Sequence, residues 1–300
     1  MKKLFVAGIV ACLTLSINIE FPQSTKAASE NKLKADISND EQKWLEGLGF
    51  TSDEIVNMSK EDLEHTSKRF KGKKGKIIAK QEEYFKVDNY IDENGKQQKK
   101  MIKSTKDEAL KEVEKLKKQK ENKHGLINFN NASAASDTEN DGWITQTTTV
   151  SDIGSTYLAK TSYKWLSNPD IGFSDTIAIT HGDNVDKIAG SEYARHWYKD
   201  GIGTHYLPAD YSADTKNYYG YADKFDLKKV GTNHPPYDHQ GYFYFEFNRD
   251  KTSDNTADLY GHYAHALTSP YYSVSLSLGA ISLSGSAASN ATDTHVDWTY

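Results

Sequence analysis

The feature that most limits how this chain can fold is a two-residue alternation in its C-terminal part, from Gly142 onward. Along residues 157–165, one set of alternate positions is aromatic, small or Thr, while the set between them contains Lys160, Ser162 and Lys164. Successive side chains of a β-strand point to opposite faces of a sheet, so this pattern predicts a strand with one face toward a core. That face would carry Tyr157, Ala159, Thr161, Tyr163 and Trp165.

Similar segments recur to the end of the chain, separated by loops that include Asn168-Pro169, Pro235-Pro236 and Ser269-Pro270. No helical pattern interrupts them, and residues 125–300 contain 27 aromatic side chains. Aromatic pairs on facing strands add roughly 0.2–1 kcal/mol each. We therefore predict an all-β antiparallel sandwich over residues 142–300. Its further strands are expected at 175–181, 191–198, 217–227, 241–248, 258–267, 271–284 and 293–300.

The N-terminal part has helical signals instead. Three short helices are predicted between residues 38 and 70, and Gly49 is placed to end the first. Ser, Thr and Asp side chains accept hydrogen bonds from the free N–H groups at a helix start. The expected caps are Ser38 or Asp40, then Thr51 with Glu54 in a capping box, and finally Ser59.

A hairpin and a longer helix should follow. Apolar and aromatic residues mark a strand over 82–91, Asn94-Gly95 supplies the turn, and 96–103 returns. A helix is predicted over 106–122 with a narrow apolar stripe, which would rest on the hairpin. We therefore expect an α+β N-terminal unit over residues 40–124. A polar linker over 125–141 would join it to the sandwich.

The first 27 residues read as a secretory signal peptide. Lys2 and Lys3 precede an apolar core from Leu4 to Leu15, and Ala27 is a small residue at the expected cleavage point. Residues 28–39 then form a polar leader. The apolar core is too short for a stable transmembrane anchor, and no later segment has the required length, so we expect a secreted protein, extracellular or associated with the cell wall.

The single cysteine, Cys12, lies within this signal, so cleavage after Ala27 leaves a cysteine-free mature chain. Disulfides and thiolate catalysis are then excluded. Ile9-Val10-Ala11-Cys12 also has the form of a lipobox, in which the cysteine is lipidated. The continuation of the apolar run past Cys12 favours ordinary cleavage.

Charge is distributed unevenly along the chain. Residues 60–124 hold 20 Lys and Arg against 13 Asp and Glu, whereas residues 125–300 hold 11 against 21. A basic N-terminal unit can attract an anionic surface such as a cell-wall polymer, and we expect no nucleic-acid partner. The alternative is that these lysines only keep helices and hairpins well solvated.

Eight histidines in the C-terminal domain invite a search for metal sites. His262 and His265 share a face only on a helix, because residues three apart on a strand point to opposite faces. No recurring zinc-site spacing is matched by His181-Gly182-Asp183 or by the pair His234 and His239. We therefore expect no metal ligand among them and place them at sheet surfaces and turns.

Two acidic segments partly match the pattern of calcium-binding loops. Residues 137–148 have acids at the first, third and fifth positions and Gly142 at the sixth, as in an EF-hand. The twelfth position is Thr148 rather than a bidentate Glu, and helices should not flank the loop. Asp250, Asp254 and Asp258 form a looser set. Neither segment is expected to bind an ion, and no cofactor is predicted.

Catalytic motifs are also lacking. The chain has no Gly-x-Ser-x-Gly elbow and no His-Glu-x-x-His sequence, and Glu is scarce after residue 124. Glu246 should lie on the tyrosine face of the strand 241–248. If these surroundings raise the pKa of its carboxyl group, it could act as a general acid. The alternative is an exposed or hydrogen-bonded strand residue with a structural role. A hydrolase would need two or more of His181, Asp183, Glu192 and Glu246 to converge. No catalytic residue is predicted.

The regular alternation of Ser with apolar residues over 272–284 has two interpretations. It is typical of an outer strand of a sandwich, and it also suits a membrane-inserting hairpin of a pore-forming toxin. Gly279 and the terminal strand that follows favour the sandwich.

Some motifs resemble uncharacterised secreted proteins of Gram-positive bacteria, which have a β-domain and no established function. In the N-terminal segment these are Trp44-Leu45, Leu48-Gly49-Phe50-Thr51, Glu54-Ile55 and Met58-Ser59. In the β-domain they are Tyr163-Lys164-Trp165-Leu166, Pro169, Asp175, Ile177, Ile179, Tyr260-Gly261-His262 and the serine-alternating segment. Residues 260–275 also resemble bacteriocins of the lactococcin-972 type. The resemblance implies no activity or site residue.

These observations together predict a secreted, non-catalytic binding or surface-interaction protein. A secreted antagonistic or membrane-acting toxin and an unrecognised extracellular hydrolase are the alternatives.

Overall fold

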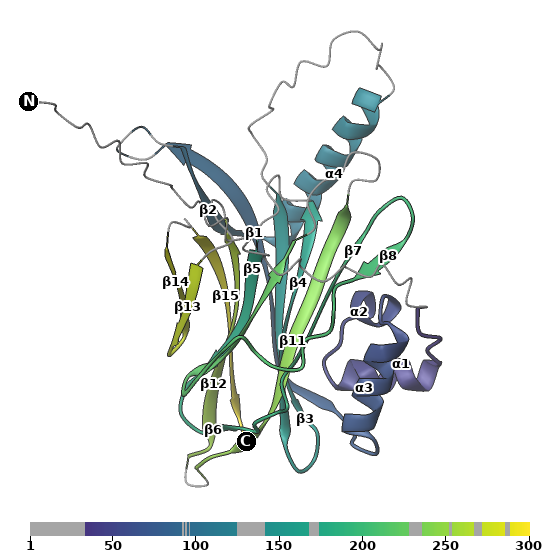
Figure 1. The fold of residues 1–300 in the computed structure, drawn as a ribbon, viewed down its shortest axis with the longest axis vertical. Coiled ribbons are helices and arrows are strands. Elements are labelled where there is room, and N and C mark those ends of the chain that lie inside the picture. The colour runs from purple at the N-terminus through teal and green to yellow at the C-terminus, as the bar shows by residue number, and fades with distance from the viewer. Residues whose placement is uncertain are drawn as a thin grey trace, which may run out of the picture.

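The computed structural model describes residues 34–91, 93, 95, 97–124, 142–167, 174–227, 236–251, 254–266, 272–285 and 289–300. The predicted signal peptide, the first half of the leader (28–33) and the whole linker over 125–141 lie outside these residues. The fold is an α+β N-terminal part followed by an antiparallel β-sandwich, as the sequence predicts (Figure 1).

Three short helices begin the described chain: α1 (Asn39–Gly47), α2 (Ser52–Val56) and α3 (Lys60–Phe70). Each begins with a complete capping box, in which the cap side chain and the acid three residues later satisfy each other's backbone N–H groups. The boxes are Ser38 with Glu41, Thr51 with Glu54 and Ser59 with Asp62. The three predicted helices are therefore confirmed. We call residues 34–75 the helical unit.

The larger sheet has eight strands in the order β2-β1-β3-β4-β11-β7-β8, and β6 also pairs with β11. Its strands are β1 (Lys76–Ile91), β2 (Gln97–Ser104), β3 (Trp143–Asp152), β4 (Tyr157–Ser167), β6 (Val185–Lys187), β7 (Tyr193–Lys199), β8 (Thr204–Tyr206) and β11 (Tyr237–Arg249). The predicted hairpin is confirmed as β1 and β2, but β1 also pairs antiparallel with β3 over most of its length. The N-terminal unit and the β-domain thus share one sheet, a connection that the sequence did not indicate.

The smaller sheet has five strands in the order β15-β12-β5-β10-β9. They are β5 (Ser174–His181), β9 (Thr215–Asn217), β10 (Gly220–Asp226), β12 (Thr256–Ala266) and β15 (Ser289–Thr299). The predicted single strand over 271–284 is instead a hairpin of β13 (Tyr272–Ser277) and β14 (Ala280–Gly285). Gly279 makes its turn at φ 64°, a backbone conformation that favours glycine.

The main core lies between the inner faces of the two sheets, and it contains the side chains that the alternation placed there. The inward residues of β11 are Phe243, Phe245 and Phe247, and those of β4 include Tyr163 and Trp165. Trp165 Nε1 donates to the hydroxyl of Tyr263 on the opposite sheet at 2.8 Å. The core is therefore largely aromatic, and this pair of polar groups satisfies each other within it.

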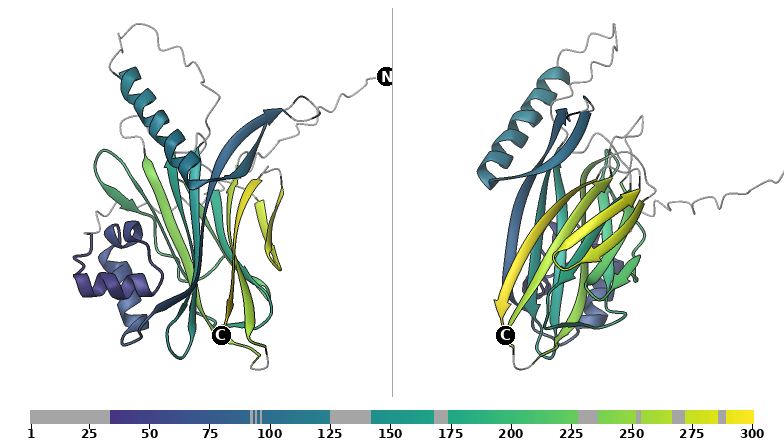
Figure 2. Two further views of the ribbon diagram at one scale, coloured as in Figure 1. Left: turned by 180° about the vertical axis from the view of Figure 1, so that it is seen from behind. Right: turned by 90° about the vertical axis from the view of Figure 1, so that its left-hand side faces the viewer.

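Helices cover the outer face of the larger sheet, as two views at right angles show (Figure 2). The helical unit packs over the lower part of this face in Figure 1, and α4 (Lys106–His124) crosses its upper part. Ala109 and Val113 of α4 pack on Tyr84 of β1 and on Trp143. This confirms the expectation that the helix rests on the hairpin. The hairpin β13–β14 lies on the outside of the smaller sheet, where Leu276 packs on Ala178 and Ala222.

Candidate functional site: a basic loop beside the docked helical unit

The outer face of the larger sheet is aromatic where the helical unit covers it. On β11, Tyr242 and Tyr244 alternate with the core phenylalanines, and they pack against residues of the helical unit such as Phe50 and Phe70. Tyr193 and Trp197 of β7 extend the same cluster. The helical unit therefore has an apolar contact with the sheet.

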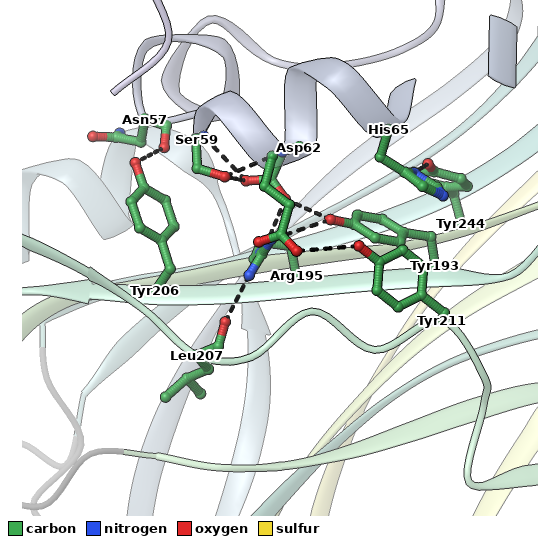
Figure 3. A network of polar contacts seen from close by, with 11 residues as sticks. Asn57, Ser59, Asp62, His65, Tyr193, Arg195, Tyr206, Leu207, Tyr211 and Tyr244 are labelled. Atoms are coloured by element: carbon green, nitrogen blue, oxygen red, sulfur yellow. Dashed lines mark hydrogen bonds and ion pairs between the residues drawn. The ribbon is translucent and has the colours of Figure 1, made fainter. Parts of the chain in front are cut away.

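A buried polar network ties α3 to β7 within this contact (Figure 3). The guanidinium of Arg195 donates from Nε to Asp62 Oδ1 at 2.5 Å and from Nη2 to Glu61 Oε2 at 2.7 Å. Tyr193 donates its hydroxyl to the same Asp62 oxygen at 2.6 Å. The side chains of Arg195 and Asp62 are both 1% exposed. Leaving either partner alone would therefore strand a buried charge.

The electrostatics of this network follow from burial and from the ion pair. Burial lowers the pKa of Arg195, but its charge and hydrogen-bond interactions with Asp62, Tyr193 and Glu61 together outweigh burial, so the net shift is upward. Burial raises the pKa of Tyr193, and the Asp62 carboxylate raises it further. Burial also raises the pKa of Tyr206 to about 12, and this tyrosine donates to the backbone C=O of Asn57. These tyrosines stay neutral, and their hydroxyls serve as donors.

Further ion pairs join the helical unit to the sheet. Lys160 of β4 is 1% exposed and donates to Glu54 of α2 at 2.9 Å. Burial lowers the pKa of Lys160, and the adjacent Glu54 partly offsets that effect. Glu246 of β11 accepts from Arg69 Nε at 2.6 Å and from Lys73 Nζ at 2.7 Å. Lys164 of β4 also pairs with Asp53 of α2. Together with the Arg195 network, these charge contacts hold the helical unit on one sheet face.

The segment Lys71–Lys76, which we call the basic loop, leads from this unit into β1. It is fixed in place, because the C=O of Lys73 accepts from Trp44 Nε1 at 3.0 Å while Lys73 Nζ reaches Glu246. The remaining lysines, Lys71, Lys74 and Lys76, are exposed. Within the described part of the chain, none of these three has an ion pair with an acid. An ordered loop therefore presents three uncompensated positive charges.

Several other lysines of the N-terminal half are paired with acids. Lys103 contacts Glu83 at 2.7 Å and Lys106 contacts Glu82 at 3.4 Å across the β1–β2 hairpin. On α4, Lys115 and Lys118 pair with Glu112 and Glu114. The excess of positive charge in residues 60–124 is thus partly neutralised by ion pairs within the fold. In the basic loop, Lys71, Lys74 and Lys76 are not neutralised in this way by any described residue.

Most C-terminal histidines are buried, so the expectation that they lie at surfaces and turns is wrong for them. The buried ones are His181, His196, His239, His262 and His265, whereas His234 lies outside the described residues. The two on β12 have different partners, as expected for opposite strand faces. His262 bonds to Thr180 at 2.7 Å and to Asp293 at 2.5 Å, and His265 bonds to Asp175 at 2.8 Å.

The row Thr180–His262–Asp293 has the residue types of a hydrolytic triad, but Thr180 and His262 are fully buried. A substrate could not reach the hydroxyl in this conformation. The row therefore works as a hydrogen-bonded link between β5, β12 and β15.

The four residues that a hydrolase would need to bring together are each held by a different partner. His181 contacts Lys187, Asp183 contacts Lys251, Glu192 contacts Lys216, and Glu246 contacts Arg69 and Lys73. Glu246 does lie on the tyrosine face, as predicted. With both of its oxygens bonded to cations, it has the geometry of an anchoring carboxylate.

The acidic segments considered as calcium loops do not assemble in the described residues. Asp137 to Asp141 lie outside them, and Thr148 points into the core, where it bonds to Thr161 and Thr294. Asp254 accepts from Thr256, and Asp258 pairs with His295.

A different acidic cluster was missed by the sequence analysis. Ligand atoms of Asp210, Asp214 and Asp223 all lie within 4.8 Å of one another. Burial and the two neighbouring carboxylates raise the pKa of Asp223 to about 9. His196 contacts Asp223 Oδ2 at 2.9 Å, and burial lowers the pKa of this histidine well below its ordinary value. Because these residues come from three separate segments, spacing alone could not have revealed them.

The outer face of the larger sheet also has two adjoining cavities, of about 370 and 460 Å³, between the helical unit and α4. They share Leu110, Lys164 and Leu166 in their walls. Their walls combine acids, lysines, hydroxyls and apolar side chains, a mixture that does not single out a ligand class. Among the described residues, no helix has both the length and the apolar character needed to cross a bilayer.

No family model matches this chain, and no curated protein matches it. Among solved structures, it is similar to Clostridium perfringens delta-toxin at 7% identity, over 55% of this chain and 86% of that chain. The TM-score of that superposition is 0.18, too low to carry an argument about fold or function.

Proposed function

We propose that this protein is exported and acts, without catalysis, by binding an anionic surface outside the cell, such as a cell-wall polymer. The observation that carries the proposal is the basic loop, with three exposed lysines that lack acidic partners among the described residues. Lysine ammonium groups are strongly hydrated point charges that suit phosphate or carboxylate groups repeated along a polymer.

The fixed position of the loop supports the proposal further. Its middle is held by Trp44 and Glu246, so the three lysines need little additional ordering when a ligand binds. Preorganisation reduces the entropic cost of association. The contacts are exposed, so binding should weaken as salt screens them, because the Debye length falls from about 10 Å at 0.1 M to about 3 Å at 1 M.

A sedimentation assay with purified Gram-positive cell walls tests this function. The wild-type full chain should be retained at low ionic strength and released by high salt. The triple variant Lys71→Gln, Lys74→Gln, Lys76→Gln should lose most of this retention.

The matched control removes the same charge from α4, as Lys111→Gln, Lys115→Gln, Lys118→Gln. This control should stay bound to the cell walls, because the lysines of the basic loop are intact. If binding depended only on net charge, both variants would lose retention equally. Equal retention of the loop variant and wild type would overturn the proposed binding site. Export is tested separately by N-terminal sequencing of protein from culture medium and wall fractions, where a chain still starting at Met1 and found only inside cells would overturn it.

A further inference from the structure

We propose that Asp210, Asp214 and Asp223 form a binding site for one divalent cation, Ca²⁺, which joins the two sheets at an edge of the sandwich. The three carboxylates present ligand atoms within 4.8 Å of one another, close enough to share a single ion. Carboxylate oxygens are the donors preferred by hard cations such as Ca²⁺.

The second observation is an orphaned oxygen on Asp223. This side chain projects from β10 and is only 2% exposed, yet its Oδ1 has no hydrogen-bond partner. Its other oxygen, Oδ2, is held by His196 Nε2 at 2.9 Å. A buried unpaired carboxylate oxygen is costly, and a cation beside Oδ1 would remove that cost.

Positive side chains do not neutralise the cluster. In the described chain, no Lys or Arg side chain pairs with any of the three carboxylates, although such pairs are frequent elsewhere in the fold. Among the described residues, the backbone N–H groups of Ser212 and Lys224 donate to the carboxylates of Asp210 and Asp214, respectively. Three acids converging on one point without a counter-charge form a site suited to a cation.

His196 orients the buried ligand. Its ring stacks on Phe225 with centroids 3.6 Å apart, and Nδ1 lies 3.4 Å from the hydroxyl of Tyr163. With Nε2 donating to Asp223 Oδ2, the ring fixes the carboxylate so that Oδ1 remains for the ion. Hydrogen bonds of this kind set the orientation of metal-binding side chains.

The ion would join the two sheets, because two of its ligands are attached to different sheets. Asp210 forms a two-way backbone bridge with Ala194 of β7 in the larger sheet, whereas Asp223 belongs to β10 in the smaller one. Asp214 lines an open cavity of about 530 Å³, which provides a route for the ion from solvent. With three protein ligands and water completing the coordination, a dissociation constant on the order of 10⁻⁴–10⁻³ M is expected, as in extracellular calcium modules.

The test uses the full chain, freed of metal with chelator. Isothermal titration with CaCl₂ and the melting temperature in its presence are measured, with Tb³⁺ luminescence as an independent probe of the occupied site. MgCl₂ and NaCl at matched ionic strength control for screening. We expect Ca²⁺ to raise the melting temperature well above both controls, with saturation at one ion per chain.

Asp214→Asn is the decisive variant, because this side chain is exposed and its loss should not disturb folding. It should weaken Ca²⁺ binding on the order of tenfold or more, and Asp223→Asn should abolish binding. Asp186→Asn, an exposed acid of β6, should bind as wild type does. No calcium response in the folded wild-type chain would overturn the site and would indicate a proton shared among the carboxylates. An unchanged response in Asp214→Asn would also overturn it.

Discussion

The buried pair of Asp62 and Arg195 yields the sharpest prediction from this structure. Asp62→Asn keeps the shape of the side chain but removes its charge, which leaves the buried guanidinium of Arg195 with Glu61 as its remaining acid. Breaking a buried ion pair from one side costs about 3–5 kcal/mol. The substitution also removes the carboxylate oxygen that completes the capping box of α3, which adds up to about 1 kcal/mol.

We therefore expect the free energy of unfolding to fall by about 4 kcal/mol, a large share of the 5–15 kcal/mol that is usual for a folded domain. Urea unfolding at neutral pH, followed by tryptophan fluorescence, measures this change, because Trp44 and Trp197 both lie in or beside the contact of the helical unit. A separate early transition would indicate that the helical unit detaches on its own.

Two controls make this prediction refutable. Glu61→Gln removes a half-exposed partner of the same arginine and should cost about 1 kcal/mol or less. The double variant Asp62→Leu, Arg195→Met removes both charges and should recover at least half of the loss. If Asp62→Asn unfolds within about 1 kcal/mol of wild type, the reasoning about this buried network is wrong.

Three further predictions concern other parts of the fold. Lys160→Met strands the buried Glu54 carboxylate and should cost about 3 kcal/mol in urea unfolding, whereas combining it with Glu54→Gln should restore most of that stability. Burial lowers the pKa of His239 to about 4 from an unfolded value near 6.5. As the pH falls, the unfolded chain therefore binds a proton at this histidine before the folded chain does. The contribution to stability is fully present above pH 6.5, and about 3 kcal/mol is lost as the pH falls to 4. In His239→Gln this loss should disappear from the pH dependence of the melting temperature. Gly261→Ala should destabilise the core by about 1–3 kcal/mol, because its Cβ would lie 2.0 Å from Thr148 Oγ1, and equal melting temperatures for the variant and wild type would contradict this.

Local rules explain which elements could be predicted from the sequence. The capping boxes at Thr51 and Ser59 act within three residues, so they mark α2 and α3 without any knowledge of the rest of the chain. The alternation along β11 likewise predicted that Glu246 lies on the tyrosine face, as the structure has it. Such patterns survive because a strand or helix must present one consistent face to a core.

The partners of charged residues could not be predicted in the same way. Glu246 was weighed as an acid catalyst, and the structure gives it Arg69 and Lys73, more than 170 positions earlier in the chain. The C-terminal histidines were expected at sheet surfaces and turns, yet five of them are buried. Which side of a strand is covered depends on packing between segments, and no local pattern carries that information.

The sequence by itself determined the element types, the positions of the helix caps, the sandwich class and the face on which most strand residues lie, because capping and alternation are short-range effects. Only the tertiary structure decided that β1 extends the larger sheet, that the helical unit covers the tyrosine face, and that Asp210, Asp214 and Asp223 meet at one point. Those arrangements depend on contacts between residues far apart in the chain, where burial removes water and makes each charge depend on a specific partner.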